Sequence, residues 1–214
     1  VIIFLRQFIS DMMCSALRVL RHQEHYSRSC CKFLLYAFIG CIPAAVVVVF
    51  FKDIFISFFS SALKTSLLLV LNGIILLMTR ISKPKRHISI DGFTLRHALL
   101  IGIAQSLAIL PGISRSGMTI TAALLLGVDP LLAFQFSFIL AVPAIIGALA
   151  IEVSQAVLCD IPIIIYGAGA AVAFMSGYAA LFLLKRFVLE KKMHRFSFYC
   201  LVVGILSSIY FYLV

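Results

Sequence analysis

Long apolar runs alternate along this chain with short segments that carry its charges. Runs with no or almost no charged side chain cover residues 33–51, 65–79, 97–114, 116–128, 130–151, 161–184 and 196–214. A helix needs about 20 such residues to cross the hydrocarbon core of a bilayer. Four runs reach that length, those that begin at Phe33, Pro130, Ile161 and Phe196. The run at Thr65 is shorter, but it gains length when Lys64 and Arg80 extend toward the headgroups. The pattern predicts an all-α, polytopic integral membrane protein.

Composition agrees with a bilayer as the solvent. Of the 214 residues, 63% are hydrophobic and 12% are charged, and the mean hydropathy is +1.15. A water-soluble domain of this size carries roughly a quarter charged residues. The six cysteines show no C-x-x-C spacing, so we interpret them as small apolar residues and expect neither a disulfide framework nor a metal site.

The basic residues gather in three segments between the apolar runs. These segments hold 14 of the 18 basic residues: Arg18, Arg21, Arg28 and Lys32; Arg80, Lys83, Lys85, Arg86 and Arg96; Lys185, Arg186, Lys191, Lys192 and Arg195. The positive-inside rule makes all three cytoplasmic and leaves the loops near Asp53 and Glu152 outside. Because the net charge of +10 is spread over loops instead of one face, we expect no nucleic-acid partner.

These sidedness constraints fix the path of the middle of the chain. Spanning helices over 1–17, 33–51, 61–80, 130–151, 162–184 and 196–214 leave both Arg96 and Asp129 on the inside. Residues 116–128 cover only about 20 Å as a helix, short of the roughly 30 Å core. The sequence therefore predicts a re-entrant helix hairpin over 97–128, broken at Pro111 and Gly112, inside one transmembrane domain that covers 1–214.

The tip of this hairpin, "LPGISRSGMT" at residues 110–119, is the candidate site. A helix break at membrane depth occurs only where protein or a water-filled cavity satisfies the freed backbone groups. Ser114 or Ser116 can cap the second half-helix, whose first N–H groups and dipole favour an anion. Arg115 adds a fork of donors suited to two phosphate oxygens, and Thr119 adds a hydroxyl on about the same face as Ser116.

Plainer interpretations stay open beside this one. Arg115 could be a loop arginine that reaches the headgroups, although an arginine at mid-bilayer usually marks function. Gln105 could face the cavity or be a packed amide with its partners satisfied. "HQEH" at 22–25 is typical of a solvated loop, and the glycines of "YGAGAA" at 166–171 favour close helix packing over nucleotide binding. No P-loop is present.

The chain resembles the undecaprenyl-diphosphate phosphatase (bacitracin-resistance) family of bacterial inner-membrane enzymes. The resemblance rests on "GIAQSLAILPG", "PGISRSGMT" and "FSFILAVPAIIGA", and it extends to "GCIPAAVVVVFF" and "SKPK". It implies two inverted repeats with re-entrant hairpins in a multi-pass inner-membrane protein. It also implies removal of the terminal phosphate of a polyprenyl diphosphate lipid, which recycles the carrier for cell-wall synthesis and confers bacitracin resistance.

Residue by residue, the resemblance implies roles for the hairpin. Arg115, Ser114 and Ser116 become catalytic groups, and the substrate-binding groups are Gln105, Gly112, Gly117 and Thr119. It also implies a divalent cation, Mg²⁺ or Ca²⁺. The family's first signature, an E-x-x-x-E pair and a serine-rich stretch with a histidine, is not in this sequence, so we assign no metal ligand here. We expect the cation's ligands in a missing N-terminal region, and this chain to be inactive alone. Contacts with membrane lipids are expected, and a homodimer is left open.

Two other hypotheses remain at this stage. A broken helix with an anion site also serves transporters, so a flippase or carrier for a lipid-linked or small anion is the alternative function. A flippase would need no acid, base or metal ligand. The third hypothesis is a truncated gene product without function.

Overall fold

The computed structural model describes residues 1, 3–8, 10, 25–81, 87–155 and 163–213. Its helices are α2 (His25–Phe50), α3 (Lys52–Phe59), α4 (Ala62–Met78), the 3₁₀ turn η1 (Ile90–Gly92), α5 (Leu95–Leu107), α6 (Arg115–Leu125), α7 (Pro130–Gln155), α8 (Ile163–Leu189) and α9 (Arg195–Leu213). Four segments are long and apolar enough to cross a membrane, namely Cys31–Phe50, Pro130–Gly147, Ile164–Leu189 and Arg195–Leu213, and Ala62–Met78 is a shorter apolar helix. Most of the predicted helix over 1–17 lies outside the described residues.

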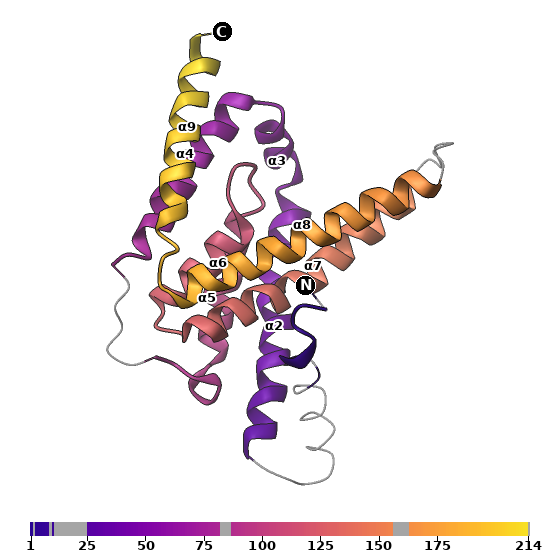
Figure 1. Ribbon diagram of the computed structural model, residues 1–214, viewed down its shortest axis with the longest axis vertical. Coiled ribbons are helices and arrows are strands. Elements are labelled where there is room, and N and C mark those ends of the chain that lie inside the picture. The colour runs from indigo at the N-terminus through magenta and orange to yellow at the C-terminus, as the bar shows by residue number, and fades with distance from the viewer. Residues whose placement is uncertain (2, 9, 11–24, 82–86, 156–162, 214) are drawn as a thin grey trace.

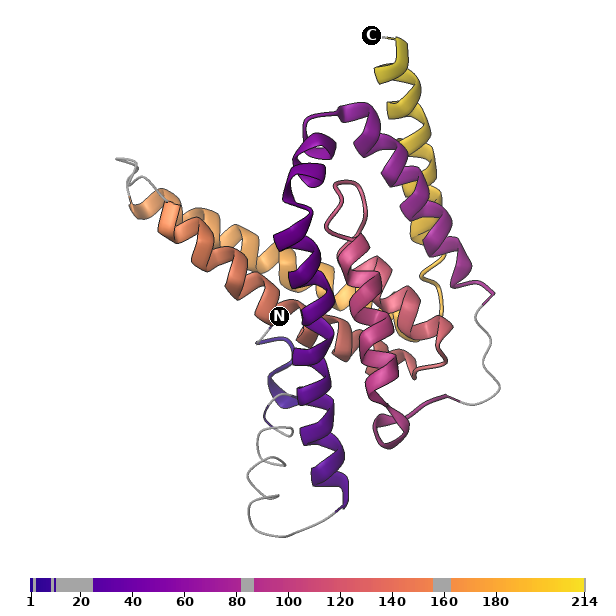
Figure 2. The same ribbon diagram turned by 180° about the vertical axis from the view of Figure 1, so that it is seen from behind.

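Two helix pairs flank a short central hairpin. α4 and α9 lie side by side along the upper part of Figure 1, while α7 and α8 form a second pair that extends away from the other helices. The view from behind shows α5 and α6 between these pairs, with the connecting loop directed toward α4 (Figure 2). α2, which precedes the hairpin in the sequence, packs along α5, and α7, which follows it, packs against α6. Helices from before and after the hairpin therefore surround it.

The hairpin enters and leaves at one face, as predicted. Its last residues lie beside the segment that precedes it: the Ile88 N–H donates to the Gly127 carbonyl at 2.8 Å, and the Asp129 N–H donates to the Ile88 carbonyl at 3.0 Å. α5 has 13 residues and α6 has 11, lengths of about 20 Å and 17 Å, so neither half crosses a core of roughly 30 Å. Lys191 Nζ lies 3.3 Å from His87 Nε2, which places the second and third basic segments on the same side.

Three local predictions need correction. The first half-helix ends at Leu107 instead of reaching Pro111, because 3₁₀-type bonds such as that from the Ala108 N–H to the Gln105 carbonyl tighten its last turn. The segment after Lys52, predicted as an external loop, forms α3, since five of its eight residues are apolar. His25, predicted to lie in a solvated loop, begins α2, whereas residues 22–24 lie outside the described residues.

An aromatic cluster fixes the base of the hairpin. The rings of Phe33, Phe93 and Phe136 contact one another with centroids 4.7 to 5.1 Å apart. All three side chains are buried: Phe33 belongs to α2, Phe93 lies just before α5, and Phe136 belongs to α7. Asp129 caps α7, since its Oδ1 accepts from the Leu131 N–H at 2.9 Å. The buried rings therefore hold the base of the hairpin against two other helices, α2 and α7.

Candidate functional site

The tip of the hairpin is a seven-residue loop, 108–114, that ends in a capped helix. Ser114 has an extended backbone, and its Oγ accepts the Gly117 N–H at 3.1 Å, so Ser114 is the cap of α6. The prediction that Ser114 or Ser116 would cap this helix is confirmed for Ser114. An Oγ that accepts in this way keeps its hydroxyl hydrogen, which can donate to a bound oxygen.

Gly112 lets the loop approach α4 closely. Its φ is +93°, a left-handed conformation that costs roughly 1–2 kcal/mol for a residue with a Cβ. A Cβ at Gly112 would also clash with the Thr65 carbonyl oxygen of α4 and lie 3.1 Å from the Leu69 nitrogen. Gly112 is therefore a structural requirement of the tip, because it brings the following residues against α4.

Asn72 of α4 holds the tip in place, and the sequence reasoning missed it. Its Oδ1 accepts the Ser114 N–H at 3.1 Å, and its Nδ2 donates to Cys200 Sγ of α9 at 3.4 Å. The side chain is buried, with 1% of its surface exposed. The available signal was an amide inside the apolar run "LLLVLNGIILLM", because polar groups inside membrane helices usually bond to a neighbouring element.

Arg115 is half-buried at the first position of α6, beside the positive end of the helix dipole. No carboxylate of the described residues pairs with it, since the ion pairs there involve only Glu190. Arg115 therefore has no counter-ion among the described residues, and it lies beside the positive end of the α6 dipole. Such a position attracts an anion.

The backbone at the start of α6 adds donors for the same anion. A helix leaves its first N–H groups without intrahelical partners. The Ser114 N–H is taken by Asn72 and the Gly117 N–H by Ser114 Oγ. In the part of the chain that the structure describes, the N–H groups of Arg115 and Ser116 make no hydrogen bond, and they point out of the helix start. Together with the Arg115 guanidinium, these two groups match the oxygen-rich surface of a phosphate.

A cavity of about 540 Å³ opens at the tip. Four of the predicted site residues line it: Gly112, Ser114, Ser116 and Gly117. Asn72 lines it as well. Arg115 does not line this cavity, which meets the start of α6 through its neighbours Ser114 and Ser116. The structure therefore gathers the two hydroxyls and the two glycines on one wall.

Thr119 and Gln105 lie apart from that wall. Thr119 is fully buried, and its Oγ1 lies 2.6 Å from Ser137 Oγ of α7 and donates to the Arg115 carbonyl at 2.9 Å. It thus ties α6 to α7 instead of facing the tip with Ser116. Gln105 is 1% exposed, and neither its Nε2 nor its Oε1 has a hydrogen-bond partner among the described residues. A buried amide without partners costs about 1–3 kcal/mol and is the kind of group that a bound molecule satisfies.

The described residues do not offer a ready set of metal ligands. No group of three or more His, Cys, Asp or Glu side chains in the described ranges could hold a metal ion. The carboxylates there that make hydrogen bonds, Asp129 and Glu190, serve as a helix cap at the start of α7 and as an ion-pair partner after the end of α8. The tip is built from hydroxyls, backbone N–H groups and one guanidinium.

These features define a class: a multi-pass helical membrane protein whose re-entrant half-helix presents anion-binding groups at membrane depth. The chain belongs to the family described as bacitracin resistance protein BacA, whose model matches residues 1–206. The predicted family and the predicted polytopic membrane fold are both confirmed.

Named relatives agree with the family match. An undecaprenyl-diphosphatase of Methanothermobacter thermautotrophicus is 39% identical over 174 residues, which cover 78% of this chain and 94% of that protein. An undecaprenyl-diphosphatase of Syntrophotalea carbinolica is 38% identical over 190 residues, which cover 86% of this chain and 69% of the relative. One from Methanococcus vannielii is 36% identical over 173 residues, or 81% and 68% of the two chains.

Proposed function

We propose that this chain hydrolyses undecaprenyl diphosphate to undecaprenyl phosphate and inorganic phosphate, and so confers bacitracin resistance. The observation that carries the proposal is the half-buried Arg115 at the start of α6, which has no ion-pair partner among the described residues. The named relatives are undecaprenyl-diphosphatases. A diphosphate would supply the negatively charged oxygens that pair with the Arg115 guanidinium. The proposal makes the chain a hydrolase that acts on a phosphoric anhydride.

The residues at the tip have separate tasks in this proposal. Phosphoryl transfer depends mainly on positioning and on stabilisation of negative charge. The Arg115 guanidinium neutralises charge on the diphosphate, while the backbone N–H groups of Arg115 and Ser116 fix its orientation. The Ser114 hydroxyl, whose oxygen already accepts from Gly117, donates its hydrogen to a phosphate oxygen, and the Ser116 hydroxyl faces the same cavity. Gln105, which the resemblance predicts to bind the substrate, does not line this cavity, so the proposal gives it no contact with the diphosphate.

A divalent cation, Mg²⁺ or Ca²⁺, is part of the proposal because a metal ion commonly neutralises charge in phosphoryl transfer. The described residues offer no cluster that fits it, so none of the roles above depends on it. Chelation with EDTA should abolish phosphate release, and added Mg²⁺ or Ca²⁺ should restore it. The homodimer and the contacts with membrane lipids also stay predictions.

The test is phosphate release from undecaprenyl diphosphate in phospholipid vesicles, measured on the chain alone and on the chain joined to a segment that carries the E-x-x-x-E signature. The chain alone is expected to be inactive, so the rates compared here and below are those of the joined protein. Arg115→Ala should lower the rate roughly a hundredfold or more, the scale on which one preorganised donor acts. Arg80→Ala is the matched control, because Arg80 is an exposed arginine in a cytoplasmic segment and should leave the rate unchanged.

Two outcomes would contradict the proposal. If Arg115→Ala kept the full rate, the guanidinium would not act on the diphosphate. If the wild-type chain moved a fluorescent prenyl diphosphate between leaflets without releasing phosphate, the transporter hypothesis would replace hydrolysis, because a flippase leaves the anhydride bond intact.

A further inference from the structure

The cavity at the tip continues from polar groups into an apolar channel, and this shape selects an amphiphilic ligand. Beyond the hairpin residues and Asn72, its walls come from Leu69 and Leu76 of α4, from side chains within the stretch 180–184 of α8 and from side chains within residues 193–200 at the start of α9. None of these lining side chains is charged. We propose that the channel between α4, α8 and α9 holds the first isoprene units of the substrate's prenyl chain. This inference rests on the proposed function and adds to it the path of the lipid tail.

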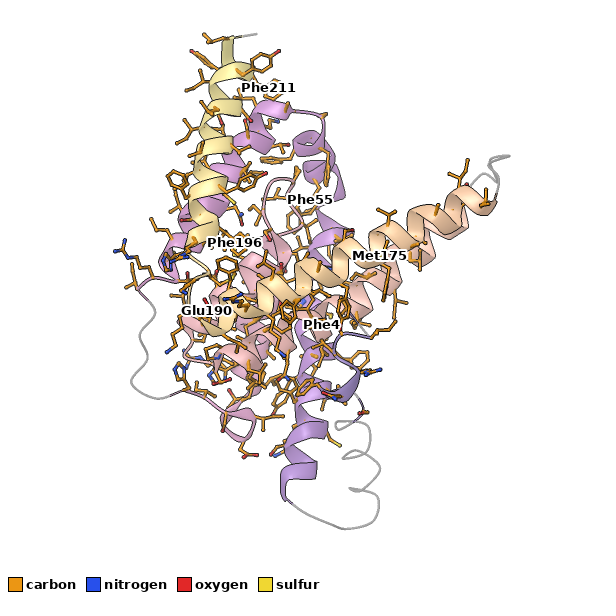
Figure 3. All side chains as sticks on the ribbon, viewed as in Figure 1. Phe4, Phe55, Met175, Glu190, Phe196 and Phe211 are labelled. Atoms are coloured by element: carbon orange, nitrogen blue, oxygen red, sulfur yellow. The ribbon has the colours of Figure 1, made fainter. Side chains whose placement is uncertain are left out.

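Burial across the channel gives it an inner and an outer side. On the inner side Leu76, which lies close to Gly117 of the hairpin, is 3% exposed and Met193 is 2% exposed. On the outer side Leu183 is 49% exposed and Tyr199 is 65% exposed. Phe196 lines the channel at the start of α9, where its ring packs against Phe187 of α8 with centroids 4.8 Å apart (Figure 3). A ligand with its diphosphate at the start of α6 would therefore lead its chain outward between α8 and α9 into the lipid.

A second cavity offers a competing path. It has a volume of about 400 Å³, is lined by Phe4, Phe138, Phe174 and Tyr178 among others, and lies between α7, α8 and the N-terminal residues. Of the described tip residues, it touches Ser116 alone, whereas the larger cavity touches five. Continuity with the anion-binding groups thus favours the channel between α8 and α9.

The lipid surroundings determine what this channel contributes. Lipid chains are about as apolar as the channel walls, so transfer of a prenyl chain from the bilayer into the channel gains little hydrophobic free energy. The gain comes from shape, because close packing against fixed walls distinguishes one chain from another. We therefore expect substitutions that narrow the channel to change which prenyl chains bind, and to have less effect on the stability of the fold.

Photoaffinity labelling of the full chain in vesicles tests the path. The probe is a prenyl diphosphate with a diazirine on its third isoprene unit, competed with unlabelled undecaprenyl diphosphate. Labels should appear on Leu183, Phe196 or Tyr199. Leu183→Trp should reduce competable labelling at least about tenfold, since small changes of volume in an apolar pocket discriminate by that order. Phe174→Trp, an exposed position of α8 that lines the other cavity, should leave labelling unchanged.

The outcomes separate the two proposals. Competable labels confined to Phe138, Phe174 or Tyr178 would overturn the path and leave the proposed function standing. Equal labelling of wild type and Leu183→Trp would overturn the path as well. No competable label at any position, together with no phosphate release by the chain joined to the E-x-x-x-E segment, would overturn the proposed function and the path with it.

Discussion

The two helix pairs that flank the hairpin are equally apolar but differ in how they use small residues. In the α4–α9 pair, a Cβ on Gly73 would lie 2.8 Å from Leu201 Cγ, and a Cβ on Gly204 would lie 2.9 Å from the Val70 nitrogen. In the α7–α8 pair, a Cβ on Gly147, Gly167, Gly169 or Gly177 would meet nothing within 4 Å among the described residues. The prediction that the glycines of "YGAGAA" allow close packing is thus wrong for this part of the chain.

The difference shows what positions the site. Close contact between α4 and α9 brings Asn72 and Cys200 together, and Asn72 then holds Ser114 at the tip. A second polar contact, from Ser208 Oγ to Ser66 Oγ at 3.1 Å, links the same two helices. By contrast, residues 164–180 of α8 are all exposed. The glycines of α4 and α9 therefore allow the two helices to approach closely, whereas those of α8 do not have this role among the described residues.

The largest effect should come from filling the α4–α9 contact. Gly204→Val places methyl groups against the Val70 backbone, so it should lower the free energy of unfolding by up to about 3 kcal/mol, as overpacking does. Gly169→Val is the matched control on α8 and should change it by less than about 0.5 kcal/mol. Denaturant unfolding in detergent micelles measures both. Equal destabilisation by the two variants would remove the distinction between the pairs.

Removal of the amide at Asn72 should have a smaller effect on stability and a clear effect on turnover. Asn72→Ala leaves the Ser114 N–H without its acceptor, which should cost about 1–2 kcal/mol and lower the rate of phosphate release. Asn72→Asp keeps an acceptor for that N–H and should recover part of the rate.

The control for Asn72 is Ser176→Ala on α8. The Ser176 hydroxyl bonds only to the Val172 and Ala173 carbonyls of its own helix, so neither stability nor rate should change. An Asn72→Ala rate equal to that of wild type would show that α4 does not position the tip.

The smallest effect concerns Glu190, in the turn that joins the two pairs (Figure 3). Hydrogen bonds from Lys192 Nζ at 2.6 Å and Arg186 Nε at 2.8 Å lower the pKa of its carboxyl from 4.5 to about 2. A lowered pKa means that any stabilisation is complete above pH 4.5 and is lost as the pH falls toward about 2. Because the group is exposed, the effect is small.

Unfolding midpoints measured against pH check this point. Wild type and Glu190→Gln should differ by a constant amount at neutral pH and should converge only below pH 4.5. Convergence at neutral pH would mean that the ion pair does not form.

Much of the fold could be predicted because its determinants are local. The lengths of the apolar runs and the positions of basic segments gave the spans, and the short run at 116–128 gave the re-entrant hairpin. α3 was missed because Lys52 and Asp53 interrupt the apolar pattern, although the following residues are apolar.

The site could be predicted only where its contacts are close in sequence. Ser114 caps a helix that begins one residue later, so its role was visible. Asn72 acts 42 residues away, and a single sequence does not say which helix packs on the tip. Thr119 shares a face with both Ser116 and Arg115, and only the position of Ser137 on α7 decides that its hydroxyl points into the core.

The central claim is that Arg115 and the start of α6 bind a lipid diphosphate. Phosphorus NMR of a methylene-bridged prenyl diphosphate, which cannot be hydrolysed, measures this binding without turnover. Titration with wild-type chain in micelles should shift both phosphorus signals saturably, Arg115→Lys should weaken the binding, and Arg115→Ala should abolish the shift. A saturable shift of the same size and midpoint with Arg115→Ala would contradict the account.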